Sequence, residues 1–181
     1  MLRIFTIALS LLVTGCSLQA PPYQVSLENV QTIKRTKVEP MNVGAIIATK
    51  KLNSISLRGS SMNSPVNKSY GDYISTAVEE ELKLAKLWSP VSSTVITGTV
   101  LTNDIDVSGF SEGSGEISVN FIVTKNNIII FDKVISAAHT FDSSFMGGIA
   151  IPNGQTNYVN LVQKLIKNLF ENKEFISAIK Q

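Results

Sequence analysis

Apolar and polar residues alternate along the middle of the chain. In segment 116–124 every second residue is apolar from Ile117 onward, and mostly polar residues fill the positions between them. This period of two is typical of a β-strand with one buried and one solvated face. Segments 94–107 and 128–141 follow a similar pattern, and the asparagines of 125–127 can form a turn because asparagine tolerates positive φ. We therefore expect these three segments to form an antiparallel meander.

The other strand-like segments are less regular. Residues 23–58 are rich in β-forming types, and 43–49 is apolar enough to predict a strand buried on both faces. Residues 58–65 contain glycine, serine, asparagine and proline, which predicts a loop. Within 94–107, four apolar residues are expected to share one buried face: Val95, Leu101, Ile105 and Val107.

Apolar residues at three- and four-residue spacing predict helices on both sides of the meander. The first covers 70–88 and follows a capping pattern that begins at Ser69. The second covers 158–170, and a short further helix covers 174–180. We expect residues 23–181 to form one α+β domain, with a mostly antiparallel sheet in the order strand, helix, three-strand meander, helix, and with two helices on one face.

The amino-terminal segment has a different pattern. Arg3 is followed by an almost wholly apolar run from Ile4 to Val13, which ends at the small residues Thr14 and Gly15. The run is about ten residues long, whereas a membrane-spanning helix needs about 20. Residues 1–15 therefore have the layout of a secretory signal peptide.

The sequence Val13-Thr14-Gly15-Cys16 resembles the lipobox of bacterial lipoproteins, although the family usually has leucine where this chain has Val13. The resemblance implies that Cys16 receives diacylglycerol, becomes the first mature residue and gains an N-linked acyl chain such as palmitate. Residues 16–22 would then be a lipidated tether. Ser17 in place of aspartate implies an outer-membrane protein that faces the periplasm, in a host with two membranes.

Other interpretations of Cys16 remain open. It could follow an ordinary signal peptide by chance, or it could be a free structural thiol. It is the single cysteine of the chain, so it has no partner for an intramolecular disulfide. Lipidation explains best why an exported protein keeps one thiol at this position.

The 181-residue chain is nearly neutral, with 16 Lys and Arg against 14 Asp and Glu. Its basic groups, such as Lys34-Arg35 and Lys50-Lys51, are short and interrupted, as is typical of solvated surface. A nucleic-acid partner would require a stronger basic face, so we expect none. The covalent lipid on Cys16 is the one cofactor-like group that we expect.

Two groups of polar residues suggest chemistry. Gly109–Gly113 matches the G-x-S-x-G nucleophile elbow around Ser111, and Asp132 and His139 follow in the chain order of an α/β-hydrolase. An elbow requires a helix directly after the serine, whereas a strand is expected here, so a turn is the better interpretation. The acidic residues near His139 lack the spacing of known metal sites, and we expect no metal there: Asp104, Asp106 and Asp142.

The segment 142–156 combines apolar residues with glycines and a proline that disfavour regular structure. Its apolar residues are Phe145, Met146, Ile149 and Ile151. They could fold back to cap the core, which we favour, or form an exposed lip for a protein partner or an acyl chain. Three aromatic residues at helical spacing offer the same choice between core and ligand groove, with core favoured: Tyr70, Tyr73 and Trp88.

Beyond the lipobox, the chain resembles small outer-membrane lipoproteins of the YajG-like type. The similarity rests on the helix "SYGDYISTAVEEELKLAKLW", the strands around "SGEISVNFIVTKNN" and the ending "NLFENKEFISAIKQ". More loosely, it resembles the lipopolysaccharide-assembly lipoprotein and the auxiliary lipoproteins of ABC-type lipid transporters. The resemblance implies a non-catalytic binding or accessory subunit in envelope assembly or lipid transport. A self-assembling structural lipoprotein is the alternative, and a serine hydrolase that uses Ser111 is third.

Overall fold

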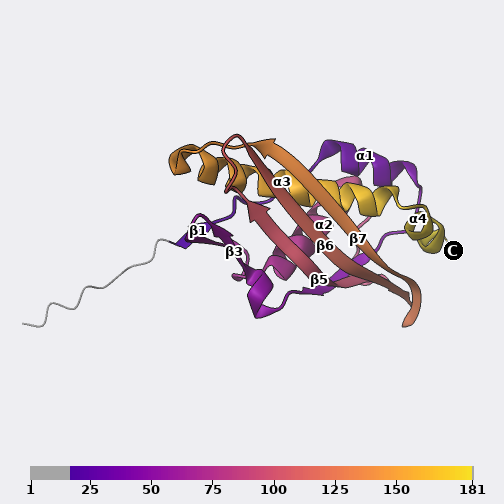
Figure 1. Ribbon diagram of the computed structural model, residues 1–181. Helices are drawn as coiled ribbons and strands as arrows, with labels where there is room; N and C mark the ends of the chain where they lie inside the picture. Colours follow the sequence, from indigo (N-terminus) through magenta and orange to yellow (C-terminus); the bar gives the residue numbers. More distant parts are fainter. Residues whose placement is uncertain (1–16, 181) are drawn as a thin grey trace, which may run out of the picture.

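A four-stranded sheet forms the frame of the computed structural model, which describes residues 17–180 (Figure 1). Its strand order is β2-β5-β6-β7. Strand β2 (Asn42–Ile47) runs parallel to β5 (Thr94–Asp106), whereas β6 (Glu112–Lys125) runs antiparallel to both of its neighbours, β5 and β7 (Ile128–Asp142). The expected meander is therefore confirmed, and the chain adds β2 at the edge of the sheet.

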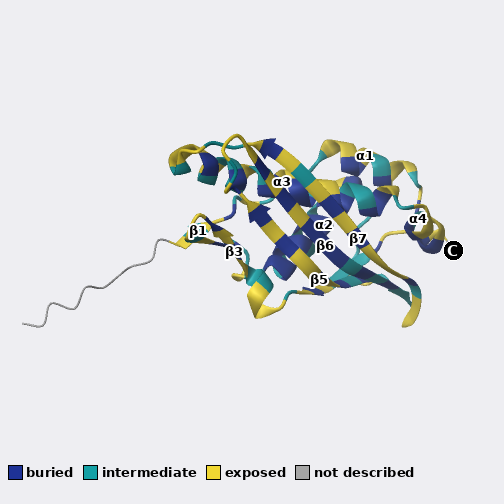
Figure 2. Ribbon diagram, in the orientation of Figure 1, coloured by how far each residue is buried: buried dark blue, intermediate teal, exposed yellow. Residues whose placement is uncertain are grey.

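The helices cover one face of this sheet, which confirms the α+β class. Helix α2 (Tyr70–Ala85) packs on β2 and β5, and α3 (Gly147–Glu171) packs on β6 and β7. Helix α1 (Leu27–Arg35) lies against both of these helices, while the short α4 (Lys173–Ile179) packs against β7 and α3. Figure 2 shows the result as alternating buried and exposed residues along each central strand.

A second, smaller sheet has the strand order β1-β4-β3. Strands β3 (Ser54–Leu57) and β4 (Ser60–Asn63) form an antiparallel hairpin, and β1 (Ser17–Gln19) pairs with β4 in parallel. The loop that we expected over 58–65 is therefore wrong for β4. The hairpin forms because Arg58 and Gly59 both adopt positive φ, 49° and 84°, which suits a two-residue turn.

Helix α1 differs from the prediction. Within the segment expected to be β-rich, α1 forms because Ser26 caps it, accepting from the backbone N–H of Asn29, and because Val30 and Ile33 are buried. Helix α1 buries too few side chains for a helical period of apolar residues to be visible in the sequence.

Helix α3 begins at Gly147, so much of the segment expected to be irregular is helical. Met146 accepts hydrogen bonds from the backbone N–H groups of Ile149 and Ala150, which starts the helix. Gly154 lets the helix approach the sheet closely, because a Cβ there would lie 2.7 Å from Val107 Cγ1. This close packing compensates for the poor helix propensity of the local sequence.

The burial of two strands also differs from the prediction. A register shift between Val100 and Thr102 changes which face of β5 is buried, so Leu101 is exposed while Ile105 and Val107 are buried. The four residues expected to share a buried face therefore do not. Strand β2 is not buried on both faces either, because helices cover one face only and Ile47 is 62% exposed.

The segment expected to be a tether packs on the domain over its described residues. Ala20 is buried, Tyr73 donates its hydroxyl to the carbonyl of Pro21 at 3.0 Å, and Gln155 donates its side-chain amide to the carbonyl of Gln19 at 2.7 Å. The chain is therefore fixed to the domain from Ser17 onward.

All four tyrosines of the sequence meet in one cluster beneath this segment. Tyr70, Tyr73 and Tyr158 are fully buried, so the core interpretation is confirmed for the first two. Tyr70 and Tyr158 lie 4.9 Å apart between ring centroids, and Tyr23 meets Tyr73 edge to face at 6.2 Å. The cluster joins the amino-terminal segment to α2 and α3.

Glu81 of α2 also binds the amino-terminal part of the chain. One carboxylate oxygen accepts hydrogen bonds from the Tyr23 hydroxyl, from Asn29 Nδ2 at 3.1 Å and from the Ser26 backbone N–H at 3.3 Å. Its second oxygen, Oε2, has no partner among the described residues. Burial raises the pKa of Glu81 to about 7, although the hydrogen bonds from these donors oppose that rise.

We expect Glu81→Gln to remove a pH dependence of stability. The folded protein binds the Glu81 proton more tightly than the unfolded chain, because its pKa is about 7 instead of about 4.5. The contribution of Glu81 to the free energy of unfolding should therefore be highest below pH 4.5, fall by up to about 3 kcal/mol as the pH rises to 7, and level off above it. The variant should lack this loss in urea titrations at pH 4.5 and 7.5. Glu80→Gln is the matched control, and equal pH dependence in both variants would contradict the assignment.

Candidate functional site: an apolar tip beside the amino-terminal strand

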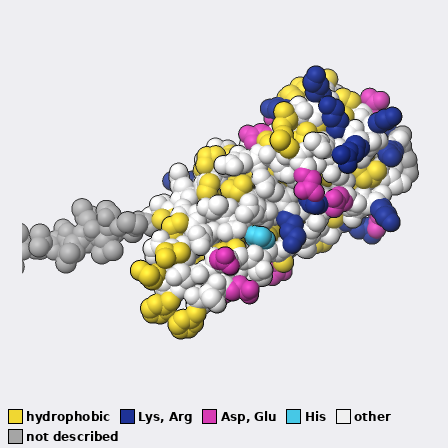
Figure 3. Space-filling view, turned by 90° about the horizontal axis from the view of Figure 1, so that it is seen from above, with side chains coloured by type: hydrophobic (Ala, Val, Ile, Leu, Met, Phe, Trp, Pro, Cys, Tyr) yellow, Lys and Arg dark blue, Asp and Glu magenta, His cyan; other side chains and the backbone are white. Residues whose placement is uncertain are grey.

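Four large apolar side chains gather in solvent at one end of the molecule. They are Phe110 in the β5–β6 loop, Phe145 and Met146 before α3, and Ile149 in its first turn, with exposed fractions of 78, 70, 64 and 47%. Figure 3 shows yellow side chains grouped at the end where the chain enters the domain. We call these four residues the apolar tip. Exposed apolar groups of this kind usually mark an interaction site.

Arg58, in the β3–β4 turn, holds the two loops of the apolar tip together. Its guanidinium donates to the carbonyls of Val107 (2.8 Å), Gly109 (3.2 Å), Ser144 (2.8 Å) and Phe145 (2.6 Å). These four acceptors come from both loops, so one side chain fixes their relative position. The loops also meet directly where Ser143 donates its backbone N–H to the carbonyl of Ser111 at 2.9 Å.

The aromatic rings of the apolar tip are ordered by this frame. Phe110 and Phe145 stack with centroids 5.5 Å apart and an interplanar angle of 11°. The β5–β6 loop turns tightly at Gly109, where a Cβ would lie 2.1 Å from the Glu112 carbonyl oxygen. The tip is therefore a built surface with a defined shape, although its side chains have little cover.

The structure separates the four apolar residues that the sequence singled out in 142–156. The core-capping interpretation that we favoured is wrong for Phe145, Met146 and Ile149, which are exposed as the lip interpretation requires. Ile151 is half-buried and packs against the core. Phe110 was missed from the sequence alone, although an aromatic residue between glycine and serine in an expected strand turn indicates an exposed apolar side chain. Arg58 was also missed, because its acceptors are backbone carbonyls.

Three carboxylates stand near the apolar tip. Glu112 and Asp142 face each other in the β6–β7 register. Asp106 accepts from the Ser108 backbone N–H at 2.7 Å, and its hydrogen bonds with Ser108 lower its pKa below the ordinary value. On the face drawn in Figure 3, most lysine and arginine side chains lie toward the opposite end of the molecule. The surroundings of the tip are therefore more acidic than basic.

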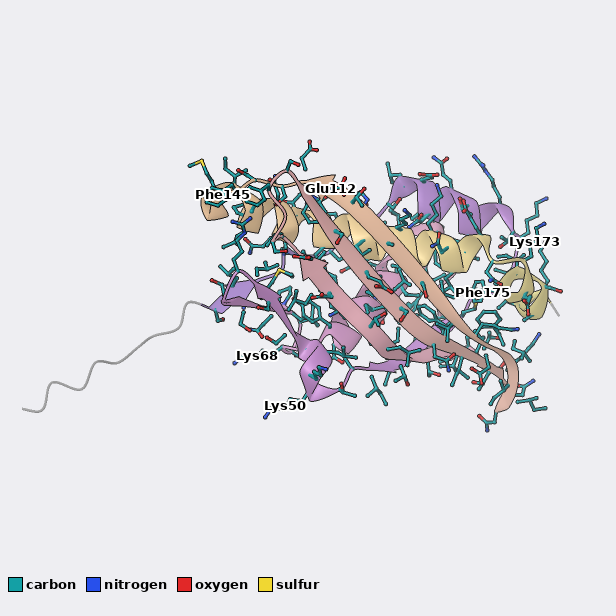
Figure 4. All side chains as sticks on the ribbon, in the orientation of Figure 1. Lys50, Lys68, Glu112, Phe145, Lys173 and Phe175 are labelled. Atoms are coloured by element: carbon teal, nitrogen blue, oxygen red, sulfur yellow. The ribbon has the colours of Figure 1, made fainter. Side chains whose placement is uncertain are left out.

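Cys16 lies outside the described residues, but the position of its neighbour is defined. Ser17 begins β1 and pairs with Ser61, three residues after Arg58. The chain thus enters the domain at the end that carries the apolar tip, as Figures 1 and 4 show. No helix within 17–180 has the length and hydrophobicity needed to cross a membrane.

The residues suggested for a hydrolase are not assembled. Ser111 is followed by strand β6, not by a helix. His139 faces the helices and contacts Asn157 at 3.0 Å, while Asp132 is paired with Asn120 at 3.0 Å. Asp132 and His139 are seven residues apart on one strand, so they point to opposite faces of the sheet. This arrangement does not form a catalytic triad.

The residues considered for a metal are also separated. Asp104 and Asp106 lie on the exposed face of β5, opposite the helix-facing His139. Across residues 17–180, no three or more His, Asp or Glu side chains form a group that could hold a metal ion.

Comparison with known proteins identifies the fold. No family model matches the chain, and no curated protein matches it. Among solved structures, it is similar to protein XCC0632 from Xanthomonas campestris, of family DUF330, with a TM-score of 0.52, 10% sequence identity and coverage of 83% of this chain and 90% of that one. A candidate lipoprotein from Caulobacter crescentus CB15 gives a TM-score of 0.47, with 11% identity and coverage of 79% and 90%. The first likeness shows a shared α+β fold.

We expect Arg58→Met to loosen the apolar tip without unfolding the domain. The variant keeps the aliphatic part of the side chain but loses its hydrogen bonds to four loop carbonyls. Amide hydrogen exchange in residues 143–149 should become roughly tenfold faster, while exchange in the β5–β7 meander stays unchanged. Arg35→Met, at the exposed end of α1, is the control for loss of one arginine charge. Unchanged exchange in 143–149 would show that Arg58 does not organise the tip.

Proposed function

We propose that this protein is a lipid-anchored lipoprotein of the bacterial outer membrane that faces the periplasm. It acts as a non-catalytic binding or accessory subunit in envelope assembly or lipid transport. The observation that carries the proposal is the lipobox-like Val13–Cys16 directly before a strand that is already part of the folded domain. A lipid on Cys16 would therefore attach the membrane to the domain with almost no intervening spacer.

The anchor supplies strength, and the fold supplies orientation. Each buried methylene contributes about 0.8 kcal/mol, so the diacylglycerol and N-acyl chains expected on Cys16 hold a protein to a bilayer stably. Because β1 is paired with β4 from Ser17 onward, a lipid on Cys16 would hold this end of the domain close to the membrane. An accessory subunit benefits from this restraint, since it presents the same face to a partner at a fixed height.

The separation of Ser111, Asp132 and His139 supports a binding role over the hydrolase alternative. The fold itself is neutral on the matter, because one fold can host many functions. Its likeness to a DUF330 protein concerns the α+β fold and adds no partner or substrate.

A self-assembling structural lipoprotein is the second candidate, and one observation favours it. At the β6–β7 hairpin, far from the apolar tip, Ile128 and Ile129 are 68 and 59% exposed on the edge strand β7. Nearer the middle of β7 the edge is covered, because Lys164 and Asn168 of α3 donate to the carbonyls of Ala138 and Ser136, both at 2.7 Å. The hairpin end is thus the part of this edge best suited to pairing with a second copy.

We expect Cys16→Ser to leave an unlipidated precursor that retains residues 1–15. The serine hydroxyl cannot replace the thiol that accepts diacylglycerol, so the later cleavage before residue 16 should also fail. Intact-mass analysis and metabolic labelling with palmitate measure both steps. Ser17→Ala should remain processed and lipidated, and Ser17→Asp should move the mature protein to the inner membrane. A Cys16→Ser protein that is still cleaved and lipidated would refute the anchor.

The accessory role is tested by cross-linking the native, membrane-attached protein in cells, followed by mass spectrometry of the captured peptides. Links to an unlike envelope protein are expected. Links between copies alone, centred on the β6–β7 hairpin, would favour the structural oligomer instead.

A further inference from the structure

We propose that the apolar tip inserts into the neutral phospholipid monolayer that holds the Cys16 lipid, so that the domain touches its membrane at two points. This inference rests on the proposed lipid anchor and deepens it by assigning a membrane-contact site and a lipid class. The site is Phe110, Phe145, Met146 and Ile149, and Arg58 is its positioning residue.

The geometry places the anchor and the tip on the same end of the domain. Ser17 lies opposite Ser61 in the ladder, and Arg58, three residues before Ser61, bonds the carbonyl of Phe145. Three residues of strand and one arginine side chain span at most roughly 20 Å. Figure 4 shows Phe145 at this end, with Lys173 and Phe175 at the other. A lipid on Cys16 would therefore bring the tip to the bilayer surface.

The side chains of the tip suit the boundary between headgroups and acyl chains. Apolar and aromatic groups enter this boundary to a depth of about 5–10 Å. Phe110, Phe145 and Met146 are more than three-fifths exposed, so little of their surface must leave other protein contacts before they enter lipid. The stacked rings are already ordered, which reduces the entropy lost on insertion.

The backbone of the tip is also prepared for a poorly hydrated environment. Loops normally stay out of lipid because unpaired carbonyls are costly there. At this tip the carbonyls of Gly109, Ser144 and Phe145 are already bonded by Arg58. Its guanidinium is held by these backbone carbonyls, and the long side chain allows it to remain at headgroup level. A patch that binds a protein in water would gain less from this arrangement.

The charges near the tip select the lipid. Asp106, Glu112 and Asp142 lie around it, and the guanidinium of Arg58 is already engaged with backbone carbonyls. Anionic lipids would be repelled by these carboxylates, so zwitterionic headgroups are the class that fits. Insertion should therefore be insensitive to salt, because it does not depend on charge attraction.

The test uses the full chain, purified with its lipid and reconstituted in phosphatidylcholine vesicles that contain lipids brominated high in the acyl chain. Phe145→Trp is made in a Trp88→Phe background, so that tryptophan fluorescence reports on the tip alone. The matched control is Ile128→Trp in the same background, because Ile128 and Phe145 are 68 and 70% exposed at opposite ends of the molecule. Thermal melts establish that both variants fold.

We expect bromolipids to quench the tip reporter at least about twofold and to leave the hairpin reporter unchanged, in low and high salt alike. Equal quenching of the two reporters, or none in either, would overturn the tip assignment while leaving the anchor intact. Quenching that appears only after anionic lipid is added would overturn the lipid class. A tip reporter shielded from aqueous iodide in native membranes, but not quenched in vesicles, would indicate a protein partner and overturn the proposal.

Intact-mass analysis of the same samples separates failure of the inference from failure of the proposed function. A chain without lipid on Cys16 overturns the anchor and the two-point contact together. A lipidated chain whose tip remains in water overturns the tip alone.

Discussion

Packing of the tyrosine cluster determines where the chain enters the folded domain, and the functional surface depends on that point. Tyr73 binds the carbonyl of Pro21, and Tyr23 reaches the buried Glu81. These contacts hold the amino-terminal segment against α2 and thereby bring β1 alongside β4. Without them, a lipid on Cys16 would hang from a free spacer, and neither the distance nor the orientation of the apolar tip would be set.

Arg58 fixes the small sheet to the two loops that carry the apolar tip. Its turn belongs to β3 and β4, yet all four of its acceptors belong to the loops around the meander. One side chain thus connects the strand pair beside the chain's point of attachment to the surface that we assign to membrane contact. At this end the two sheets share one apolar core, to which the small sheet contributes Ile55, Leu57 and Met62, and the Arg58 guanidinium adds hydrogen bonds between the small sheet and the loops.

Much of the fold could be predicted from the sequence, because the meander strands and helix α2 bury side chains with a regular period. Prediction failed where tertiary contacts overrode local preference: α1 buries few residues, β4 has one fully buried side chain, Met62, and α3 begins in a segment with two glycines and a proline. The same limit applied to the site. Phe145 and Met146 were visible as unusual loop residues, but their meeting with Phe110 and Arg58 depends on which loops the sheet brings together.

The pairing of β1 with β4 also determines how the protein would respond to a pulling force. For a chain attached to a bilayer through Cys16, any pull between domain and membrane passes first through the three-residue ladder between β1 and β4. That ladder is short, whereas the meander behind it is held by strands of 13 to 15 residues. Under load, β1 would peel away before the sheet deforms, which lengthens the connection and leaves the domain folded. The small sheet would therefore yield first under a pulling force and protect the rest of the domain from unfolding.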